Sequence, residues 1–291
     1  MPFNTFEDKA FTQLLEMAIA EDFDSSGDLT SKAILPADLM GKATLVGRTD
    51  GVLAGIEAGE RVLRKIAPEA EWFSLMEDGE SLQHGSLIAK IQGPMRGILS
   101  AERIILNFMQ RLSGIATLSA KFVAKVHDLP VKILDTRKTN PGWRYLDKYA
   151  VRCGGGQNHR MNLSDGILIK DNHLAALGGG PVAIRQSILL SRQYFPGTWN
   201  IEIEVDDLEM FDCALQSSPT IILLDNMNDE DMKAAVQRKN AIAPDILLEA
   251  SGGITLANVR EVALTGVDRI SVGAITHSAP ALDLGLDYNF S

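Results

Sequence analysis

Residues 201–225, IEIEVDDLEMFDCALQSSPTIILLD, contain two short apolar runs with a different pattern between them. Both runs are rich in β-branched residues, which favour strands. Between them, Leu208, Phe211 and Leu215 recur at the spacing of one helix face. An apolar strand, a helix and a second apolar strand form the unit from which parallel sheets covered on both faces are built.

The same rhythm extends on both sides of this unit. Further strand-like runs are VKILD (131–135), GILIK (166–170), ILLEA (246–250) and DRISV (268–272), and helices are expected near 207–217, 228–242 and 255–265. No Gly-x-Gly-x-x-Gly or Walker motif follows any of these strands, which disfavours the nucleotide-binding open sheets. A β/α barrel fits better, although only about six strands are predicted where the common barrel has eight.

Before residue 115 the pattern is different. One face of an N-terminal helix is marked by apolar residues from Phe11 to Ile19. Short strands are expected at 42–48, 51–56, 71–76 and 86–93, with helices near 57–67 and 98–113. We therefore expect an N-terminal α/β domain (1–115), an incomplete β/α barrel domain (116–276) and a C-terminal tail (277–291) that packs back on the N-terminal domain.

Composition excludes several classes of protein. The chain has 291 residues, a formal net charge of -10 and 45% hydrophobic residues, as in an ordinary globular protein. An acidic chain with pI near 5.0 is a poor nucleic-acid binder. The N-terminus lacks the apolar core of a signal peptide, and no stretch approaches the ~20 apolar residues of a membrane span. Cys153 and Cys213 are too few for a disulfide framework. We expect a cytoplasmic protein.

Positive charge is nevertheless concentrated around a glycine run, Gly154–Gly156. Between Lys132 and His173 there are eight Lys or Arg residues and four Asp or Glu, so the rest of the chain carries -14 (-10 minus +4). A local cluster in an acidic chain favours a small anionic ligand over a polyanion. The helical stripe of Arg144, Lys148 and Arg152 is expected to be solvated or to steer phosphate.

Residues at the ends of the expected strands differ in chemistry from one strand to the next. Active sites of β/α barrels lie where the strands end. The first two strand ends supply cations, the middle two carboxylates and the last two glycines; the residues are Arg137, Lys138, Lys170, Glu204, Asp225, Ser251, Gly252, Gly253 and Gly273. Any one of them could simply cap a helix, but this order is harder to ascribe to solvation.

Each group suits a different part of a substrate pair. The cations, together with His159 and Arg160, could hold a compact dianion, because a guanidinium matches a carboxylate with two parallel hydrogen bonds. Glu204 and Asp225 could coordinate Mg²⁺ with the help of substrate phosphate oxygens. Glycine-rich loops after the last strands are typical phosphate sites of barrels. Together these groups indicate transfer from an activated, phosphorylated sugar.

Three long segments resemble the quinolinate phosphoribosyltransferase family. They are DTRKTNPGWR (135–144), KYAVRCGGGQNHR (148–160) and LSDGILIKDNH (163–173). Shorter similar segments include EDFDSSGDLTS, SAERIILNFMQRLSGIAT, LLDN and EASGGI, so the resemblance covers nearly the whole chain in order.

The resemblance implies a fold, an assembly and a reaction. The fold is an N-terminal α/β sandwich followed by a barrel of fewer than eight strands. The assembly is a homodimer, with higher assembly possible, in which Arg103 completes the neighbouring subunit's site. The reaction joins quinolinate to 5-phosphoribosyl 1-diphosphate with Mg²⁺, and yields nicotinate mononucleotide, CO₂ and diphosphate for NAD biosynthesis.

Three other functions stay open at this point. A nicotinate phosphoribosyltransferase would bind a mono-acid and release no CO₂. A Schiff-base aldolase would use Lys170 as its nucleophile, which needs a desolvated and isolated lysine. A non-catalytic anion-binding module would have no need of Glu204 and Asp225.

Overall fold

The computed structural model describes residues 1–197 and 199–289. It separates into two compact units: unit 1 comprises residues 1–120, 138–156 and 275–291, and unit 2 comprises 121–137 and 157–274. The expected domain boundary at 115 falls within one helix, α4 (Met95–Lys125). The domain boundaries at 115 and 276 stay a prediction from the sequence. No helix among the described residues is long and apolar enough to cross a membrane.

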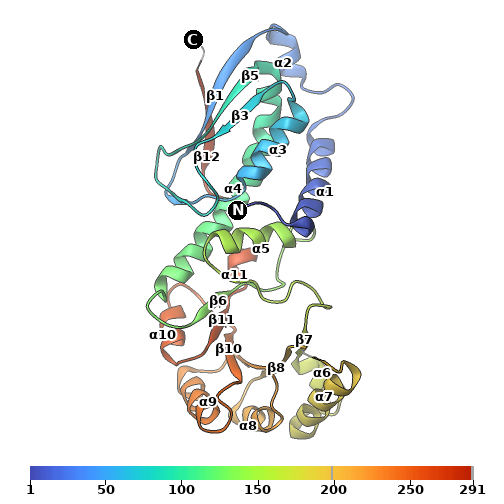
Figure 1. The fold of residues 1–291 in the computed structure, drawn as a ribbon, viewed down its shortest axis with the longest axis vertical. Helices are drawn as coiled ribbons and strands as arrows, with labels where there is room; N and C mark the ends of the chain where they lie inside the picture. Colours follow the sequence, from blue (N-terminus) through green and yellow to red (C-terminus); the bar gives the residue numbers. More distant parts are fainter. Residues whose placement is uncertain (198, 290–291) are drawn as a thin grey trace. The chain divides into compact units, whose positions relative to one another are not determined.

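Unit 1 is built on a four-stranded antiparallel sheet. Its order is β12 (Leu284–Asn289), β1 (Met40–Gly47), β5 (Leu87–Pro94) and β3 (Glu71–Ser74), and a separate pair joins β2 (Gly51–Val52) to β4 (Ser81–Leu82). Strand β12 brings the C-terminal tail back to this unit, because it pairs with β1 along its whole length. Helices α1, α3 and α4 lie on the same side of the sheet (Figure 1).

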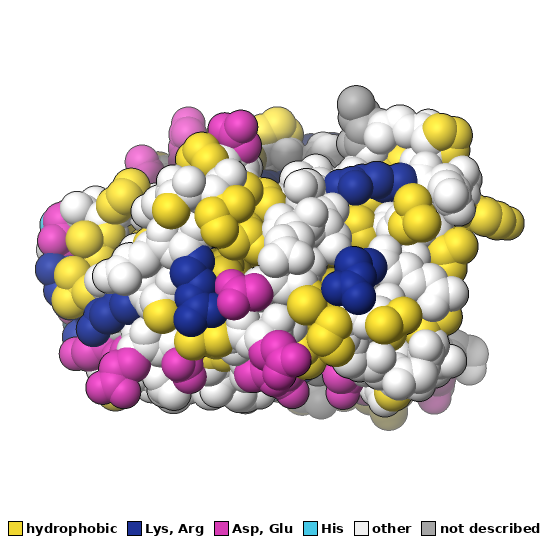
Figure 2. Space-filling view, turned by 90° about the horizontal axis from the view of Figure 1, so that it is seen from below, with side chains coloured by type: hydrophobic (Ala, Val, Ile, Leu, Met, Phe, Trp, Pro, Cys, Tyr) yellow, Lys and Arg dark blue, Asp and Glu magenta, His cyan; other side chains and the backbone are white. Residues whose placement is uncertain are grey.

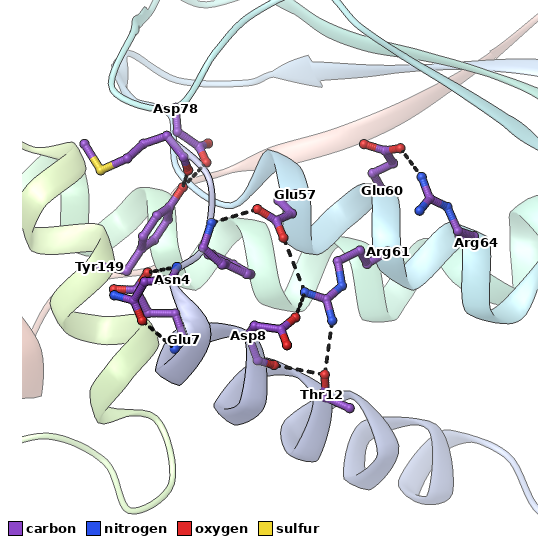
Figure 3. Close-up of polar contacts among 12 residues, drawn as sticks. Asn4, Glu7, Asp8, Thr12, Glu57, Glu60, Arg61, Arg64, Asp78 and Tyr149 are labelled. Carbon is purple, nitrogen blue, oxygen red and sulfur yellow. Dashed lines mark hydrogen bonds and ion pairs between the residues drawn. The ribbon is translucent and has the colours of Figure 1, made fainter.

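The helices of unit 1 are α1 (Thr5–Asp22), α2 (Leu29–Ile34), α3 (Ile56–Ile66), α4 and α5 (Arg144–Cys153). Polar contacts join the start of α1 to α3 (Figure 3). Asn4 caps α1, and the Phe3 N–H donates to Glu57 on α3 at 2.8 Å. Arg61 then contacts Asp8 on α1 at 2.6 Å. Helix α1 is thus tied to unit 1 at its N-terminal end.

Helix α5 corrects one expectation. Its basic stripe is not a solvated surface, because Lys148 is 0% exposed and Arg152 pairs with the fully buried Glu7. Asp147 on the same helix is also fully buried and accepts two hydrogen bonds from Arg111 at 2.9 Å. These charges hold α5 inside unit 1. The spacing of the three basic residues does mark one face of a helix, but Lys148 on that face is buried and Arg144 and Arg152 are half-buried.

Unit 2 is a six-stranded parallel sheet with helices outside it. The strands are β6 (Lys132–Leu134), β7 (Ile167–Ile169), β8 (Ile201–Val205), β9 (Ile221–Asp225), β10 (Leu247–Ser251) and β11 (Arg269–Ser271). The helices α6 (Asp171–Ala176), α7 (Gly180–Tyr194), α8 (Leu208–Gln216), α9 (Asp229–Ile242) and α10 (Val259–Leu264) form an arc around the strands (Figure 1). The short helix α11 (Ala274–His277) follows β11. All six expected strands are present.

The strand order is that of a barrel with one open seam. Strands run β6-β11-β10-β9-β8-β7, so each strand from β7 onward lies beside the next, and the last strand lies beside the first. The seam falls between β6 and β7. Gln157 enters it from the glycine run: its N–H donates to Ile133 at 2.8 Å, and its carbonyl accepts from Asp135 at 3.1 Å. Gly155, at φ +81°, supplies the left-handed turn before this bridge.

Candidate active site

Asp135, just after β6, fixes the segment that follows the glycine run. Its carboxylate is fully buried and accepts from the Asn158 side chain at 2.6 Å and from the His159 N–H at 3.0 Å. These bonds continue the bridge that Gln157 makes with β6. Two motifs that are separated in the sequence, DTRK and GGGQNHR, therefore meet at the seam of unit 2.

Arg137 and Arg160 come from these two motifs. Both are half-buried, and Arg160 Nη1 donates to the Gly166 carbonyl at 3.1 Å. Burial lowers the pKa of Arg160, and the nearby charge of Arg137 lowers it further. Arg160 Nε is buried and has no acceptor among the described residues. The negative charges of Glu202 and Asp165 act on the pKa of Arg160 in the opposite direction, as an anion bound beside it would.

His159 points away from bulk water, with only 9% of its surface exposed. Its Nε2 lies 3.1 Å from Glu202 and 3.3 Å from Glu249. Burial disfavours the charged ring, but the two carboxylates outweigh it and raise the pKa of His159 to about 9. In the neutral ring, Nδ1 accepts the Arg160 N–H at 2.8 Å.

Lys170 and Glu204 lie side by side at the ends of neighbouring strands. The register pairs Ile169 with Ile203, and Lys170 Nζ reaches Glu204 at 2.7 Å. Side chains two residues apart on a strand share a face and stand ~7 Å apart. Glu202 and Glu204 are related in this way on β8. Of the two His159 partners, Glu202 therefore lies one step below Glu204, whereas Glu249 lies in the same register row as Glu204, because both pair with Leu223.

Asp225 and the glycine loop after β10 also meet. Asp225 is paired with Ser251 in the parallel register, and the Asn226 N–H donates to the Ser251 carbonyl at 2.9 Å. A Cβ on Gly252 would lie only 2.2 Å from the Asn226 side chain, and φ at Gly252 is +92°. Only glycine fits there. Gly253 also has positive φ, and the half-buried Gly273 stands two residues past β11.

The other two expected site residues belong to unit 1. Lys138 is exposed, and its carbonyl accepts a hydrogen bond from Thr276 at 2.9 Å. Arg103 is exposed on α4, next to Glu102, which accepts from the Tyr288 hydroxyl. The remaining expected residues are all in unit 2.

A cavity of about 270 Å³ opens beside His159 and Arg160. Glu202, Gly166, Asn200 and Arg269 are among the residues that line it. This volume is close to the lower end for small-molecule sites, ~300 Å³. Glu202 and Glu249 were not among the site residues predicted from the sequence. The alternation of IEIEV could have revealed Glu202, because it puts two carboxylates on one face of a strand otherwise made of apolar residues.

Comparisons with known proteins identify the family of this chain. The family model for the N-terminal domain of quinolinate phosphoribosyl transferase matches residues 28–113, and the model for its C-terminal domain matches 115–287. The chain belongs to the quinolinate phosphoribosyltransferase family. The resemblance found in the sequence is thereby confirmed.

Individual members of the family are similar over nearly their whole length. The nicotinate-nucleotide pyrophosphorylase [carboxylating] of Mycobacterium leprae (strain TN) is 43% identical, over 94% of this chain and 95% of that protein. A probable nicotinate-nucleotide pyrophosphorylase [carboxylating] of Bacillus subtilis is 39% identical. The solved structure of nicotinate-nucleotide pyrophosphorylase from Francisella tularensis superposes with a TM-score of 0.89 at 36% identity, and covers 97% of this chain and 96% of that one.

The raised pKa of His159 predicts a dependence of stability on pH. Because the pKa of His159 in the folded protein is about 9, above the ordinary value of 6.5, the charged ring contributes stability that is present below pH 6.5 and is lost as pH rises through 9. The contribution is on the order of 3 kcal/mol. Urea unfolding of the wild type and of His159→Gln, compared from pH 6 to pH 10, should show the wild type losing stability that the variant does not lose. Parallel curves would contradict the raised pKa.

Proposed function

We infer that this chain catalyses the transfer of phosphoribosyl from 5-phosphoribosyl 1-diphosphate to quinolinate, with decarboxylation, in NAD biosynthesis. The observation that carries the inference is the match of both domain models of one family along a single chain. The products are nicotinate mononucleotide, CO₂ and diphosphate. The chain is then a pentosyltransferase.

The arginine pair is proposed to bind quinolinate. This substrate is a small planar dianion, and Arg137 and Arg160 are two half-buried guanidinium groups from the two segments that Asp135 joins. Each can bind a carboxylate through two hydrogen bonds. Lys138, His159 and Lys170 are assigned to the same substrate. A bound dianion also relieves the repulsion between the two arginines, which supports the assignment.

The carboxylate and glycine strand ends are proposed to bind the phosphoribosyl donor. Glu204 and Asp225 are half-buried carboxylates on one sheet face, and Mg²⁺ needs only one or two such groups when substrate phosphates supply the other oxygens. The residues therefore fit the metal. When bound, Mg²⁺ would stabilise negative charge on the departing diphosphate. Ser251–Gly253 and Gly273 are assigned to phosphate through their backbone N–H groups.

The protein itself is proposed to act by positioning. The ring nitrogen of quinolinate attacks C1 of the ribose as the C1–O bond to diphosphate breaks, and positive charge on that nitrogen then permits loss of the adjacent carboxylate as CO₂, after which the ring carbon takes up a proton. Neither step needs a nucleophile from the chain. Orientation of two bound reactants can contribute ~7–11 kcal/mol to lowering the barrier. Arg137 and Arg160 orient the acceptor, and the strand-end loops orient the donor.

The alternatives are less well supported. Lys170 forms an ion pair with Glu204 at 2.7 Å and its side chain is 46% exposed, whereas a Schiff-base lysine needs a desolvated site. Human nicotinic acid phosphoribosyltransferase shares the fold with a TM-score of 0.61 at 14% identity, so fold alone does not exclude a mono-acid acceptor. The arginine pair favours the dicarboxylate. In Figure 2 the basic side chains drawn in colour are scattered among acidic and apolar ones, which fits a small ligand.

Assembly and location remain proposals. We keep the homodimer, with Arg103 offered to the neighbouring subunit's site, on the strength of its exposed position on α4 and of the family resemblance. The cytoplasm stays the expected compartment, although some tobacco relatives are named as mitochondrial.

The reaction predicts a simple requirement for three components. Purified protein should release CO₂ from carboxyl-labelled quinolinate only when the phosphoribosyl donor and Mg²⁺ are both present. Nicotinate offered instead of quinolinate should give little product. Absence of CO₂ release with all components present would contradict the function, and full activity in EDTA would contradict only the metal assignment to Glu204 and Asp225.

Loss of either arginine should affect the two substrates differently. A hydrogen bond to a charged group contributes ~1.5–3 kcal/mol, so Arg137→Ala or Arg160→Ala should weaken quinolinate binding by roughly 10- to 150-fold. Donor binding should change much less, and Lys replacements should restore only part of the loss, because an ammonium lacks the fork geometry. Calorimetric titration with each substrate separately is the measurement. Equal losses for both substrates would mean that the arginines attract any anion.

The dimer proposal predicts complementation between two inactive variants. Arg103→Ala and Lys138→Ala should each lose activity, and a mixed dimer can contain one site with neither defect. Mixing them should therefore restore part of the activity, with two samples of the same variant as the control. No recovery, once subunit exchange has been demonstrated, would place Arg103 in the site of its own subunit or outside the chemistry.

A further inference from the structure

Two carboxylates are buried inside unit 2 without a place in the proposed reaction. Glu202 on β8 is 4% exposed, and Glu249 on β10 is 0% exposed. A buried carboxylate is costly unless neighbouring groups balance its charge. Their neighbours are His159 and Arg269. These four residues are called the buried cluster below.

In the buried cluster Glu202 is hydrogen-bonded to His159 Nε2, whereas Glu249 forms ion pairs with the same ring nitrogen and with Arg269. His159 Nε2 lies between the two carboxylates, 3.1 Å from Glu202 and 3.3 Å from Glu249. Arg269 Nε lies 2.8 Å from the other oxygen of Glu249. Because a carboxylate only accepts, His159 must carry its proton on Nε2. His159 and the two glutamates could also surround a metal ion, but a dication there would face the Arg269 guanidinium and lose the Nε2–H bonds.

The buried cluster is connected to the candidate site through the backbone. His159 follows the glycine run and directly precedes Arg160. Its Nδ1 is 2.8 Å from the Arg160 backbone nitrogen, and Asp135 holds the His159 N–H at 3.0 Å. A ring that loses its Nε2 partners can turn or shift, and the Arg160 backbone beside it must then adjust.

We propose that Glu202 and Glu249 are positioning residues, which hold the His159 ring through Nε2 and thereby fix Arg160 for quinolinate. This proposal rests on the proposed function, in which Arg160 binds that substrate. Neither glutamate contacts the reacting atoms. They act on the part of the site that is proposed to bind quinolinate. The phosphoribosyl donor is assigned to Glu204, Asp225 and the glycine loops.

Glu249→Gln is the variant of choice, because Glu202 stands two residues from the proposed metal ligand Glu204, whereas Glu249 stands two residues from Ser251, whose assigned phosphate contact is a backbone N–H. Glutamine keeps the shape of the side chain but carries no negative charge to hold the His159 ring. Quinolinate binding should weaken ~10-fold, as for the loss of a charged contact. Donor binding should stay within about twofold, because the substitution leaves the backbone N–H groups of the loop in place. Calorimetry with each substrate measures both constants.

A double-mutant cycle shows whether Glu249 acts through His159. If it does, His159→Gln with Glu249→Gln should bind quinolinate no more weakly than His159→Gln alone. The matched control is Glu7→Gln in unit 1, another fully buried glutamate bonded to an arginine, Arg152. It should leave quinolinate affinity within about twofold and show no coupling to His159. Losses that multiply for His159 and Glu249, or an unchanged affinity in Glu249→Gln, would overturn the proposal.

A measurement on the unmodified protein covers the case in which the variants do not fold. Imidazole ¹⁵N spectra should show His159 Nε2 protonated from pH 6 to pH 10, whether the ring is neutral or charged. A neutral ring with its proton on Nδ1 would overturn the proposal. Failure of the proposed function is distinct, since wild-type protein would then release no CO₂ from quinolinate whatever the ring shows.

Discussion

The buried carboxylate of Asp135 is the interaction on which the candidate site depends. It ends β6 and accepts from the Asn158 side chain and the His159 backbone, so it ties the residues after the glycine run to the parallel sheet. Together with the two hydrogen bonds of Gln157 to β6, Asp135 anchors the segment that carries Arg160. Arg137 follows Asp135 by two residues, so this carboxylate joins the two segments that carry the arginines.

Parallel pairing places the rest of the site. Because every strand of unit 2 runs in the same direction, their carboxyl ends share one edge, where Lys170, Glu204, Asp225 and Ser251 all lie. The open seam between β6 and β7 admits the segment that carries His159 and Arg160. A complete eight-stranded barrel would fill this position with further strands. In this seam the bridge of Gln157 to β6 takes the place of a strand, and the cavity beside Arg160 is lined by Gly166, Asn200 and Arg269 at the amino ends of β7, β8 and β11.

Much of this arrangement follows from the sequence. The apolar runs from 131 to 272 predict all six strands of unit 2, because buried parallel strands need continuous apolar residues. The positions of the strand-end residues were also predictable, because each apolar run stops where its strand ends. Side chains that become buried through a tertiary contact were not predictable. Lys148 and Arg152 have the spacing of a solvated stripe, and only the packing of α5 inside unit 1 buries Lys148 and pairs Arg152 with Glu7. Strand β12 was also missed, since its pairing with β1 joins residues more than 230 positions apart.

The central claim is that Arg137 and Arg160, brought together through Asp135, form the site for the quinolinate dianion. A crystal structure of the chain with quinolinate bound tests it most directly. Each guanidinium should lie within hydrogen-bonding distance, ~2.7–2.9 Å, of a quinolinate carboxylate oxygen, with the Asp135–His159 bond intact. Quinolinate bound elsewhere, with neither arginine in contact with it, would contradict the claim.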